Sequence, residues 1–190
     1  DAMLAAANEL AVREFATHSR KADLEEPIFD GERVHLIPEI RRALDAFTAG
    51  GFTAMTPDTD VGGLQVPVVV EKAVFAHFCA ANIATSAYPF LTTANANLML
   101  AHASAAQIER FARPQLQGRF FGTMCLSEPQ AGSSLGDVRT RALPDPAPDD
   151  TALGARYRLF GNKMWISGGE HELAENIVHL VLAKIPLGDG

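Results

Sequence analysis

The chain has 190 residues, of which 47% are hydrophobic and 21% are charged. This composition is typical of a folded globular protein and excludes an intrinsically disordered chain. The formal net charge of −7 gives a surface field that repels phosphates on average, so we expect no nucleic-acid partner.

Several other classes are excluded in the same way. No stretch reaches the roughly 18 uninterrupted apolar residues of a membrane-spanning helix. Residues 1–20 lack the basic start and apolar centre of a signal peptide, so we expect no export. The six histidines show no metal-ligand spacing with one another or with the two cysteines, and we predict no metal. Cys79 and Cys125 form no Cys-x-x-Cys pair, and we expect both to be reduced core thiols of a cytoplasmic protein.

Helical patterns begin at the N-terminus. Residues 2–15 carry apolar side chains at helical spacing. Residues 38–49 predict a second helix, because a proline stands at the start of this stretch and two glycines follow its end. Between residues 53 and 67, prolines and glycines mixed with short polar side chains predict a surface loop.

A third helix is predicted over residues 68–84, where nearly every position is apolar. Such a helix is expected to be covered by neighbours on most sides, as in a bundle. His77 within it is a candidate ligand or acid/base, but a core histidine with satisfied hydrogen bonds is the favoured interpretation.

The chain is expected to change direction at Tyr88-Pro89 and to resume as a helix over residues 92–102. Asn95 and Asn97 are the unusual members of that helix. A ligand contact is one interpretation of these two side chains, and capping or a solvated edge is the simpler one.

Ser104, followed three residues later by Gln107, forms the pattern of a capping box. It predicts one more short helix, which runs towards Arg113 before Pro114 interferes with its continuation. The predicted helices together indicate an α-helical domain over residues 1–118.

Short strand patterns separated by turn residues follow Gly118. A proline-rich acidic stretch over residues 144–150 predicts an exposed loop. The chain is therefore predicted to be an α+β protein, in which an N-terminal α-helical bundle precedes a partial, small β-barrel-like domain over residues 119–190. The predicted strands are 119–126, 138–143, 155–160, 163–167 and 176–184.

Residues 124–134 stand out because an apolar strand runs directly into a turn of small residues. Backbone N–H groups and hydroxyls of Ala131, Gly132, Ser133 and Ser134 could face an anion, and Gly132 permits close approach of the backbone. A turn that only connects two strands is the alternative.

A second cluster, Gly-Asn-Lys-Met-Trp-Ile-Ser-Gly-Gly over residues 161–169, contains the chain's single tryptophan on a predicted strand. Taken alone, Trp165 is expected in the core. Its neighbours favour another function, since an indole beside a hydroxyl and free backbone donors could flank a planar conjugated ring.

Together the two clusters resemble the acyl-CoA dehydrogenase family, whose middle domain carries Thr-Glu-Pro-x-Ala-Gly-Ser-Asp and, further on, Gly-x-Lys-x-Trp-Ile-Thr-Asn-Gly. The first motif here reads Ser-Glu-Pro-Gln-Ala-Gly-Ser-Ser over residues 127–134. The order and spacing of the motifs match the family. The resemblance extends through the helical half and into residues 170–184, which look like the large-subunit branch that includes the methylmercaptopropionyl-CoA dehydrogenases.

The resemblance implies that FAD is the cofactor. Leu126 and Ser127 would lie near the flavin ring, and Ser133 near the cofactor diphosphate and the CoA part of the substrate. Ser167 would hydrogen-bond the hydride-accepting nitrogen of the flavin. The residues implied to bind the cofactor are Met124, Cys125, Leu126, Ser127, Gly132, Ser133, Trp165, Ile166 and Ser167.

Four positions depart from the family pattern. Serine replaces threonine at 127 and 167, which keeps a hydroxyl and loses the methyl that restricts its rotamer. Ser134 stands where the family has aspartate, and Gly168 where it has asparagine. Whatever structural role the family aspartate has is in question here.

The family reaction forms a 2,3-enoyl-CoA from an acyl-CoA by proton transfer to a carboxylate base and hydride transfer to the flavin. The family's base is a glutamate of a C-terminal helical domain, which we expect to be absent from this chain. We therefore assign no catalytic residue and expect no turnover from these residues alone. Solvated or structural roles are expected for Glu128, Glu170, Glu172 and Glu175.

The resemblance also implies an acyl-CoA substrate, an electron acceptor such as an electron-transfer flavoprotein, and a homo-oligomeric parent protein. Three alternatives remain open at this point. The chain could belong to a noncatalytic protein that binds acyl-CoA or a partner on the same scaffold, to an acyl-CoA oxidase, or to a DNA-associated relative that the acidic balance disfavours.

Overall fold

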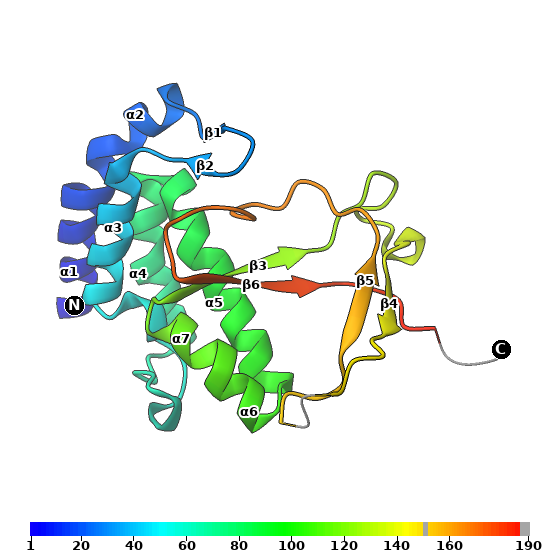
Figure 1. Cartoon of the computed structure of the whole chain (residues 1–190). Coiled ribbons are helices and arrows are strands. Elements are labelled where there is room, and N and C mark those ends of the chain that lie inside the picture. The colour runs from blue at the N-terminus through cyan, green and yellow to red at the C-terminus, as the bar shows by residue number, and fades with distance from the viewer. Residues whose placement is uncertain (150–151, 187–190) are drawn as a thin grey trace.

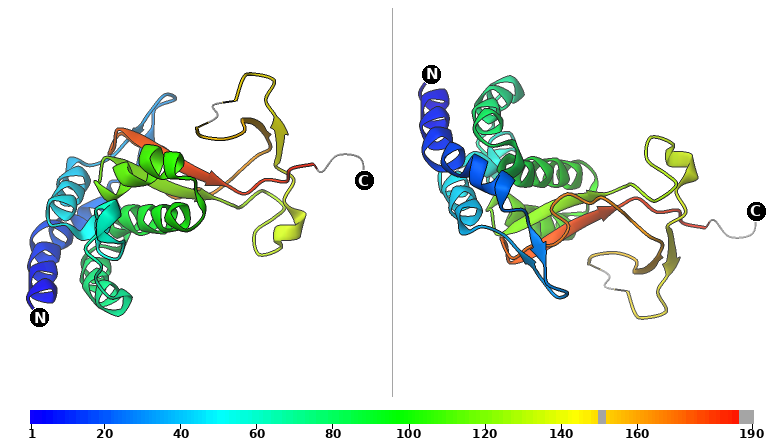
Figure 2. Two further views of the ribbon diagram at one scale, coloured as in Figure 1. Left: turned by 90° about the horizontal axis from the view of Figure 1, so that it is seen from below. Right: turned by 90° about the horizontal axis from the view of Figure 1, so that it is seen from above.

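The structure, a computed structural model, describes residues 1–149 and 152–186. Helices gather at one end of the molecule, β3 and β6 run side by side away from them, and the β4–β5 pair lies at the far end (Figures 1 and 2). The helices are α1 (Ala2–Leu10), α2 (Ser19–Leu24), α3 (Pro38–Ala49), α4 (Val68–Ala81), α5 (Ile83–His102), α6 (Ala105–Gln107) and α7 (Arg113–Leu116), and the strands are β1 (Ile28–Phe29), β2 (Val34–His35), β3 (Phe120–Cys125), β4 (Arg141–Pro144), β5 (Tyr157–Phe160) and β6 (Asn176–Val181).

The predicted α+β class is confirmed. Within the described residues the strands pair two by two and do not close into a barrel. The division into domains at residue 118 stays a prediction. The end of the predicted second domain, residues 187–190, and the end of the predicted acidic loop, Asp150, lie outside the described residues. None of the helices described is long and apolar enough to cross a membrane.

The first predicted helix is confirmed, and it continues beyond residue 15. α1 runs into a π-helical turn over Ala11–Phe15 and then a 3-10 turn that leads to α2. Phe15 is fully buried, with its ring centroid 5.0 Å from that of Phe78 on α4 and 6.2 Å from that of Phe47 on α3. These aromatic rings join three helices into one core.

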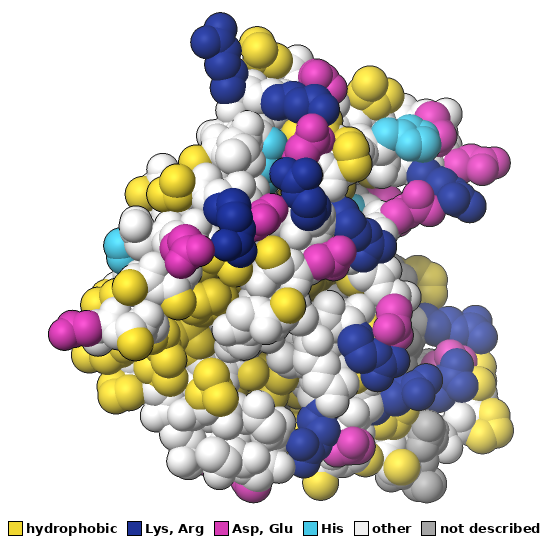
Figure 3. All heavy atoms as spheres, turned by 90° about the vertical axis from the view of Figure 1, so that its left-hand side faces the viewer, with side chains coloured by type: hydrophobic (Ala, Val, Ile, Leu, Met, Phe, Trp, Pro, Cys, Tyr) yellow, Lys and Arg dark blue, Asp and Glu magenta, His cyan; other side chains and the backbone are white. Residues whose placement is uncertain are grey.

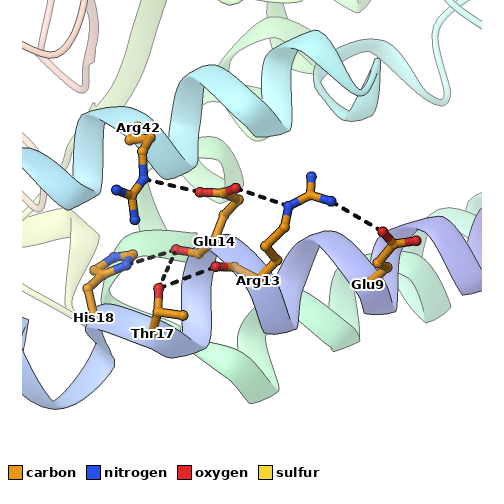
Figure 4. Close-up of polar contacts among 6 residues, drawn as sticks. All are labelled: Glu9, Arg13, Glu14, Thr17, His18 and Arg42. Atoms are coloured by element: carbon orange, nitrogen blue, oxygen red, sulfur yellow. Dashed lines mark hydrogen bonds and ion pairs between the residues drawn. The ribbon is translucent and has the colours of Figure 1, made fainter.

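Polar contacts fix the end of this helical segment against α3 (Figure 4) and against α5. The Nδ1 of His18 lies 2.9 Å from the carbonyl oxygen of Glu14, and its Nε2 lies 2.9 Å from Oγ1 of Thr85. A carbonyl only accepts, so Nδ1–H donates and Nε2 accepts from the hydroxyl. The Glu14 carboxylate accepts from Arg13 and, on α3, from Arg42. Burial lowers the pKa of His18, which favours this neutral bridging form.

α3 has the predicted bounds, with proline in its first turn. Gly51, just past its end, has φ +78°, which is the left-handed conformation that glycine favours. The predicted loop over residues 53–67 is confirmed apart from 3-10 turns at Phe52–Ala54 and Thr59–Val61.

α4 is a helix as predicted, but the expectation that neighbours cover it on most sides is wrong within this structure. Its buried residues, Glu71, Val74 and Phe78, form a single stripe, whereas Val68 is 61% and Val69 75% exposed. Hydrophobic side chains also gather on part of the face shown in Figure 3. Apolar composition alone does not reveal which sides of a helix have neighbours. His77 is half-buried.

The predicted change of direction at Tyr88-Pro89 is also wrong, because α5 passes through Pro89 without a break. The chain turns earlier, at Asn82, whose Oδ1 accepts from the Thr85 N–H at 3.0 Å. Pro89 is buried and lines the same small cavity as Phe121. Packing of a long helix outweighs the one backbone bond that proline removes.

The capping box is confirmed: Ser104 and Gln107 exchange both reciprocal hydrogen bonds, at 2.9 and 3.3 Å. The helix does not stop at Pro114 as predicted, but continues to Leu116 through a π-helical turn over Ile108–Ala112. Pro114 comes just after this π-helical turn, where the backbone hydrogen-bond pattern of the helix is already irregular.

Four of the predicted strands are confirmed as shorter strands, and one of them, β4, ends one residue later than predicted, at Pro144. β3 and β6 pair in parallel from Phe120 opposite Asn176 to Cys125 opposite Val181, and β4 pairs antiparallel with β5. The strand predicted over residues 163–167 is wrong, since residues 163–166 have no regular secondary structure and Ser167 begins a turn. The sequence reading missed the antiparallel β1–β2 pair, because strands of two residues show no periodicity.

Asn95 joins α5 to both parallel strands, and the solvated-edge interpretation is wrong for it. The side chain is 2% exposed. Its Nδ2 donates to the carbonyl oxygens of Thr123 on β3, at 3.0 Å, and Val178 on β6, at 2.8 Å. Its Oδ1 accepts from Gln115 at 3.0 Å. Asn97 is exposed, as a solvated edge requires.

Candidate functional site

The first predicted motif continues directly from the end of β3. Met124 is 41% exposed and Cys125 is 7% exposed, as expected for neighbouring strand positions that face opposite sides. Beyond Ser127 the chain forms a tight turn, in which the N–H groups of Glu128 and Ala131 each donate to the carbonyl of the other, at 2.8 and 3.1 Å. Gly132 and Ser133 follow on the surface.

The carboxylate of Glu128 is the buried centre of this turn, at 2% exposure. It accepts from the hydroxyl of Thr140 at 2.6 Å, from the backbone N–H groups of Thr140 and Arg139 at 3.0 and 2.7 Å, and from Lys163 at 2.9 Å. Burial acts to raise the pKa of Glu128, but these hydrogen bonds outweigh it and lower the pKa far below its ordinary value. An ionised, saturated carboxylate fits the structural role predicted for Glu128.

Lys163 joins the two motifs. Its Nζ donates to the Leu126 carbonyl at 2.9 Å as well as to the carboxylate of Glu128, and its side chain is 12% exposed. The N–H of the next residue, Met164, donates to the Ser127 carbonyl at 3.0 Å. The second motif is therefore held against the end of β3, directly after Cys125.

Trp165 is neither on a strand nor in the core, contrary to both expectations. Its φ is +56° and it is 75% exposed. The left-handed conformation is uncommon for a bulky residue and costs about 1 to 3 kcal/mol, so the surroundings must fix it. The bond from Met164 to Ser127 fixes one side, and a turn closed by the Gly169 N–H on the Ile166 carbonyl, at 3.2 Å, fixes the other.

A cavity of about 340 Å³ brings Cys125 and Ile166 together, and Lys163 also lines it. Leu126 and Ser127 are joined to the second motif through the bonds of Lys163 and Met164, whereas Ser167 is exposed. A larger cavity of about 700 Å³ lies between α5 and β6, and none of the predicted site residues lines it.

The connection that carries the second motif is anchored at its other end by His171, which the sequence analysis did not single out. His171 is 5% exposed, and its ring centroid lies 5.3 Å from that of Tyr88 on α5 and 5.5 Å from that of Phe121 on β3. Arg41 on α3 donates to the carbonyls of Glu172 and Leu173. His171 follows two glycines and precedes an apolar strand. It was not singled out because no helical or strand periodicity runs through it.

The remaining acids named from the sequence lie in this connection. Glu172 pairs with Arg33 at 2.8 Å and Glu175 with Arg119 at 2.7 Å, and all four side chains are exposed. Glu170 is exposed. These positions fit the solvated roles expected of them. Among the described residues, no group of three or more His, Cys, Asp and Glu side chains is placed to hold a metal ion.

No protein-family model matches the chain. The chain is 36% identical over 164 residues to a 3-methylmercaptopropionyl-CoA dehydrogenase of Ruegeria pomeroyi, a match that covers 86% of the chain and 27% of that protein. It is 30% identical over 192 residues to a broad-specificity linear acyl-CoA dehydrogenase of Mycobacterium tuberculosis, covering 99% of the chain and 30% of that protein. The chain thus spans less than a third of the length of these relatives.

The fold is shared with a crystal structure of an acyl-CoA dehydrogenase complexed with FAD from Bacillus anthracis. The TM-score is 0.75 at 18% identity, and the match covers 96% of this chain and 28% of that one. The relatives found by sequence show the family, and the solved structure shows the shared fold. The chain belongs to the acyl-CoA dehydrogenase family.

Proposed function

We propose that this chain supplies the helical and flavin-contacting part of an FAD-dependent acyl-CoA dehydrogenase. The observation that carries the proposal is the junction of the two motifs, since Lys163 and Met164 hold the second against the end of β3. Relatives matched over 86% and 99% of the chain are acyl-CoA dehydrogenases, which supports an activity of the whole protein in lipid and fatty acid metabolism.

The residues present fit a flat conjugated ring with a polar edge. Trp165 and Met124 offer exposed apolar surface, and Ser127 and Ser167 carry hydroxyls in the same two segments. Around Gly132 the space is open, because a Cβ built there would meet no atom within 4 Å. FAD, when bound, would accept the hydride from the acyl-CoA.

The roles of the chain's own residues follow from these positions. Met124 to Ser127 and Trp165 to Ser167 would bind and orient the ring, and the hydroxyl of Ser167 would donate a hydrogen bond to its polar edge. Gly132 and Ser133 would face the diphosphate, and Ser133 also the CoA part of the substrate. The base that takes the proton would come from residues outside this chain.

The remaining parts of the proposal concern the whole protein. Its substrate would be an acyl-CoA thioester and its electron acceptor an electron-transfer flavoprotein, in a homo-oligomer. Cys79 and Cys125 are both free thiols, which supports a cytoplasmic location.

The protein at the length of its relatives provides the test. It should be purified yellow, and an acyl-CoA should bleach the flavin and reduce an acceptor dye. A colourless protein that still binds acyl-CoA would contradict the proposal and favour a noncatalytic binding protein. Stoichiometric peroxide production in air would identify an acyl-CoA oxidase instead.

Substitutions at Ser167 test its hydroxyl within the same protein. Ser167→Ala is expected to slow flavin reduction by acyl-CoA about tenfold, because one hydrogen bond to the ring is lost. Ser167→Thr keeps the hydroxyl that the family has at this position and should retain the rate. Stopped-flow absorbance measures both, and equal rates for the alanine and threonine variants would remove Ser167 from the site.

A further inference from the structure

The connection from β5 to β6 carries the second motif and is fixed at two points. It runs back from the β4–β5 end of the molecule to the helices, and is orange in Figure 1. Lys163 fixes its first part to the end of β3. His171 fixes its later part to α5 and β3. Trp165, Ile166 and Ser167 lie between these two points.

His171 is held by packing on its ring faces and edges and by one hydrogen bond. The Tyr88 ring meets it at an interplanar angle of 82° and the Phe121 ring at 66°. Its Nδ1 accepts from the Leu173 N–H at 3.2 Å. Only a ring that lacks a proton on Nδ1 can accept this bond, so the observed geometry belongs to neutral histidine.

Tyr88 also lies close to the connection at a second place, Gly168. A Cβ built on Gly168 would lie 3.4 Å from two carbons of the Tyr88 ring, and Gly168 has φ +62°. Gly168, Gly169 and Glu170 are the residues between Ser167 and His171. Because two glycines place little restriction on the backbone, the position of Ser167 depends on what holds the residues after them.

The charged groups around His171 come from three elements. Glu170 on the connection favours the protonated ring, whereas Arg41 on α3 and His179 on β6 disfavour it. The Arg41 guanidinium donates hydrogen bonds to the carbonyls of Glu172 and Leu173. The Glu172 carboxylate forms an ion pair with Arg33. No carboxylate among the described residues forms a hydrogen bond or ion pair with the imidazole of His171.

We propose that His171 is a positioning residue, whose neutral ring between Tyr88 and Phe121 fixes the segment that carries Trp165, Ile166 and Ser167 against the end of β3. The effect on the segment is independent of any cofactor. The effect on a bound flavin rests on the function proposed above.

A pH dependence follows from this anchor. Burial, the largest cause, lowers the pKa of His171 to about 4 from the ordinary value of 6.5. A released, solvated His171 therefore binds more protons than the anchored one between these two values. The anchored form is favoured fully above pH 6.5 and loses this advantage progressively as pH falls towards about 4, so release of the segment is expected within that range.

Trp165 is the single tryptophan of the chain and provides the probe. The 190-residue chain labelled with 5-fluorotryptophan gives one ¹⁹F resonance, which reports on the segment without flavin. In the unsubstituted chain this resonance should keep its position from pH 8 to 6.5 and move in the acid range. Far-UV circular dichroism over the same range separates release of the segment from global unfolding.

Three substitutions complete the design. His171→Phe keeps a ring between Tyr88 and Phe121 and cannot titrate, so its resonance should start near the original position and lose the acid transition. His171→Ala should have a displaced resonance already at neutral pH. His102→Ala, at the exposed end of α5, should keep the original titration. If His171→Ala does not fold, the His171→Phe variant alone still tests the proposal.

A resonance in the unsubstituted chain that stays unchanged down to pH 3.5, or an acid transition that persists in His171→Phe, would overturn the proposal. In the FAD-bound protein, His171→Ala should also raise the flavin fluorescence at neutral pH. Failure of that flavin result alone, with the ¹⁹F result as expected, would count against the proposed function and leave the anchor in place.

Discussion

Lys163→Met is expected to lower the melting temperature by about 10 °C, because removing one partner of a buried ion pair leaves the other charge unpaired. Glu128 is 2% exposed and would remain ionised inside the turn. The Leu126 carbonyl would also lose its donor. The same substitution should abolish tight FAD binding, because it leaves the Met164 to Ser127 backbone bond as the remaining hydrogen bond described between the two motifs that are proposed to hold the ring.

Lys184→Met is the matched control. Lys184 is exposed and donates a single bond from Nζ, to the Gly136 carbonyl at 2.8 Å, so its replacement should change the melting temperature by no more than about 2 °C. Differential scanning calorimetry with and without FAD measures both variants. Equal melting temperatures for the two variants would show that Lys163 does not hold the motifs together.

The elements that were predicted well are those whose signals are local. α3 has the predicted bounds because proline and glycine mark both of its ends within the sequence, and the capping box joins Ser104 to Gln107, only three positions later. Pro89 led to a wrong prediction of a chain turn, because proline does weaken a helix locally. The packing that keeps α5 helical around Pro89 comes from residues distant in the sequence. Local patterns do not contain that information.

The candidate site, too, could be predicted from the sequence only in part. The two motifs could be found from their residues, and the structure brings them together, yet the ion pair that joins them links residues 35 positions apart. The left-handed backbone of Trp165 depends on a bond to Ser127 across the same gap. His171 was missed for the same reason, since its partners Tyr88 and Phe121 come from a helix and a strand far earlier in the chain.

Asn95→Ala is expected to reduce the free energy of unfolding by about 3 kcal/mol, because the carbonyls of Thr123 and Val178 lose a buried donor at once. Asn97→Ala, on the exposed side of the same helix, removes the same side chain at a cost within about 0.5 kcal/mol. Urea unfolding measures both.

Because the side-chain amide of Asn95 contacts β3 and β6 together, its loss should also speed amide hydrogen exchange along both strands, including β3 just before the Met124 to Ser127 segment. An unchanged exchange pattern with a full loss of stability would mean that the bonds of Asn95 support the helix alone, and that the strands hold their parallel pairing without it.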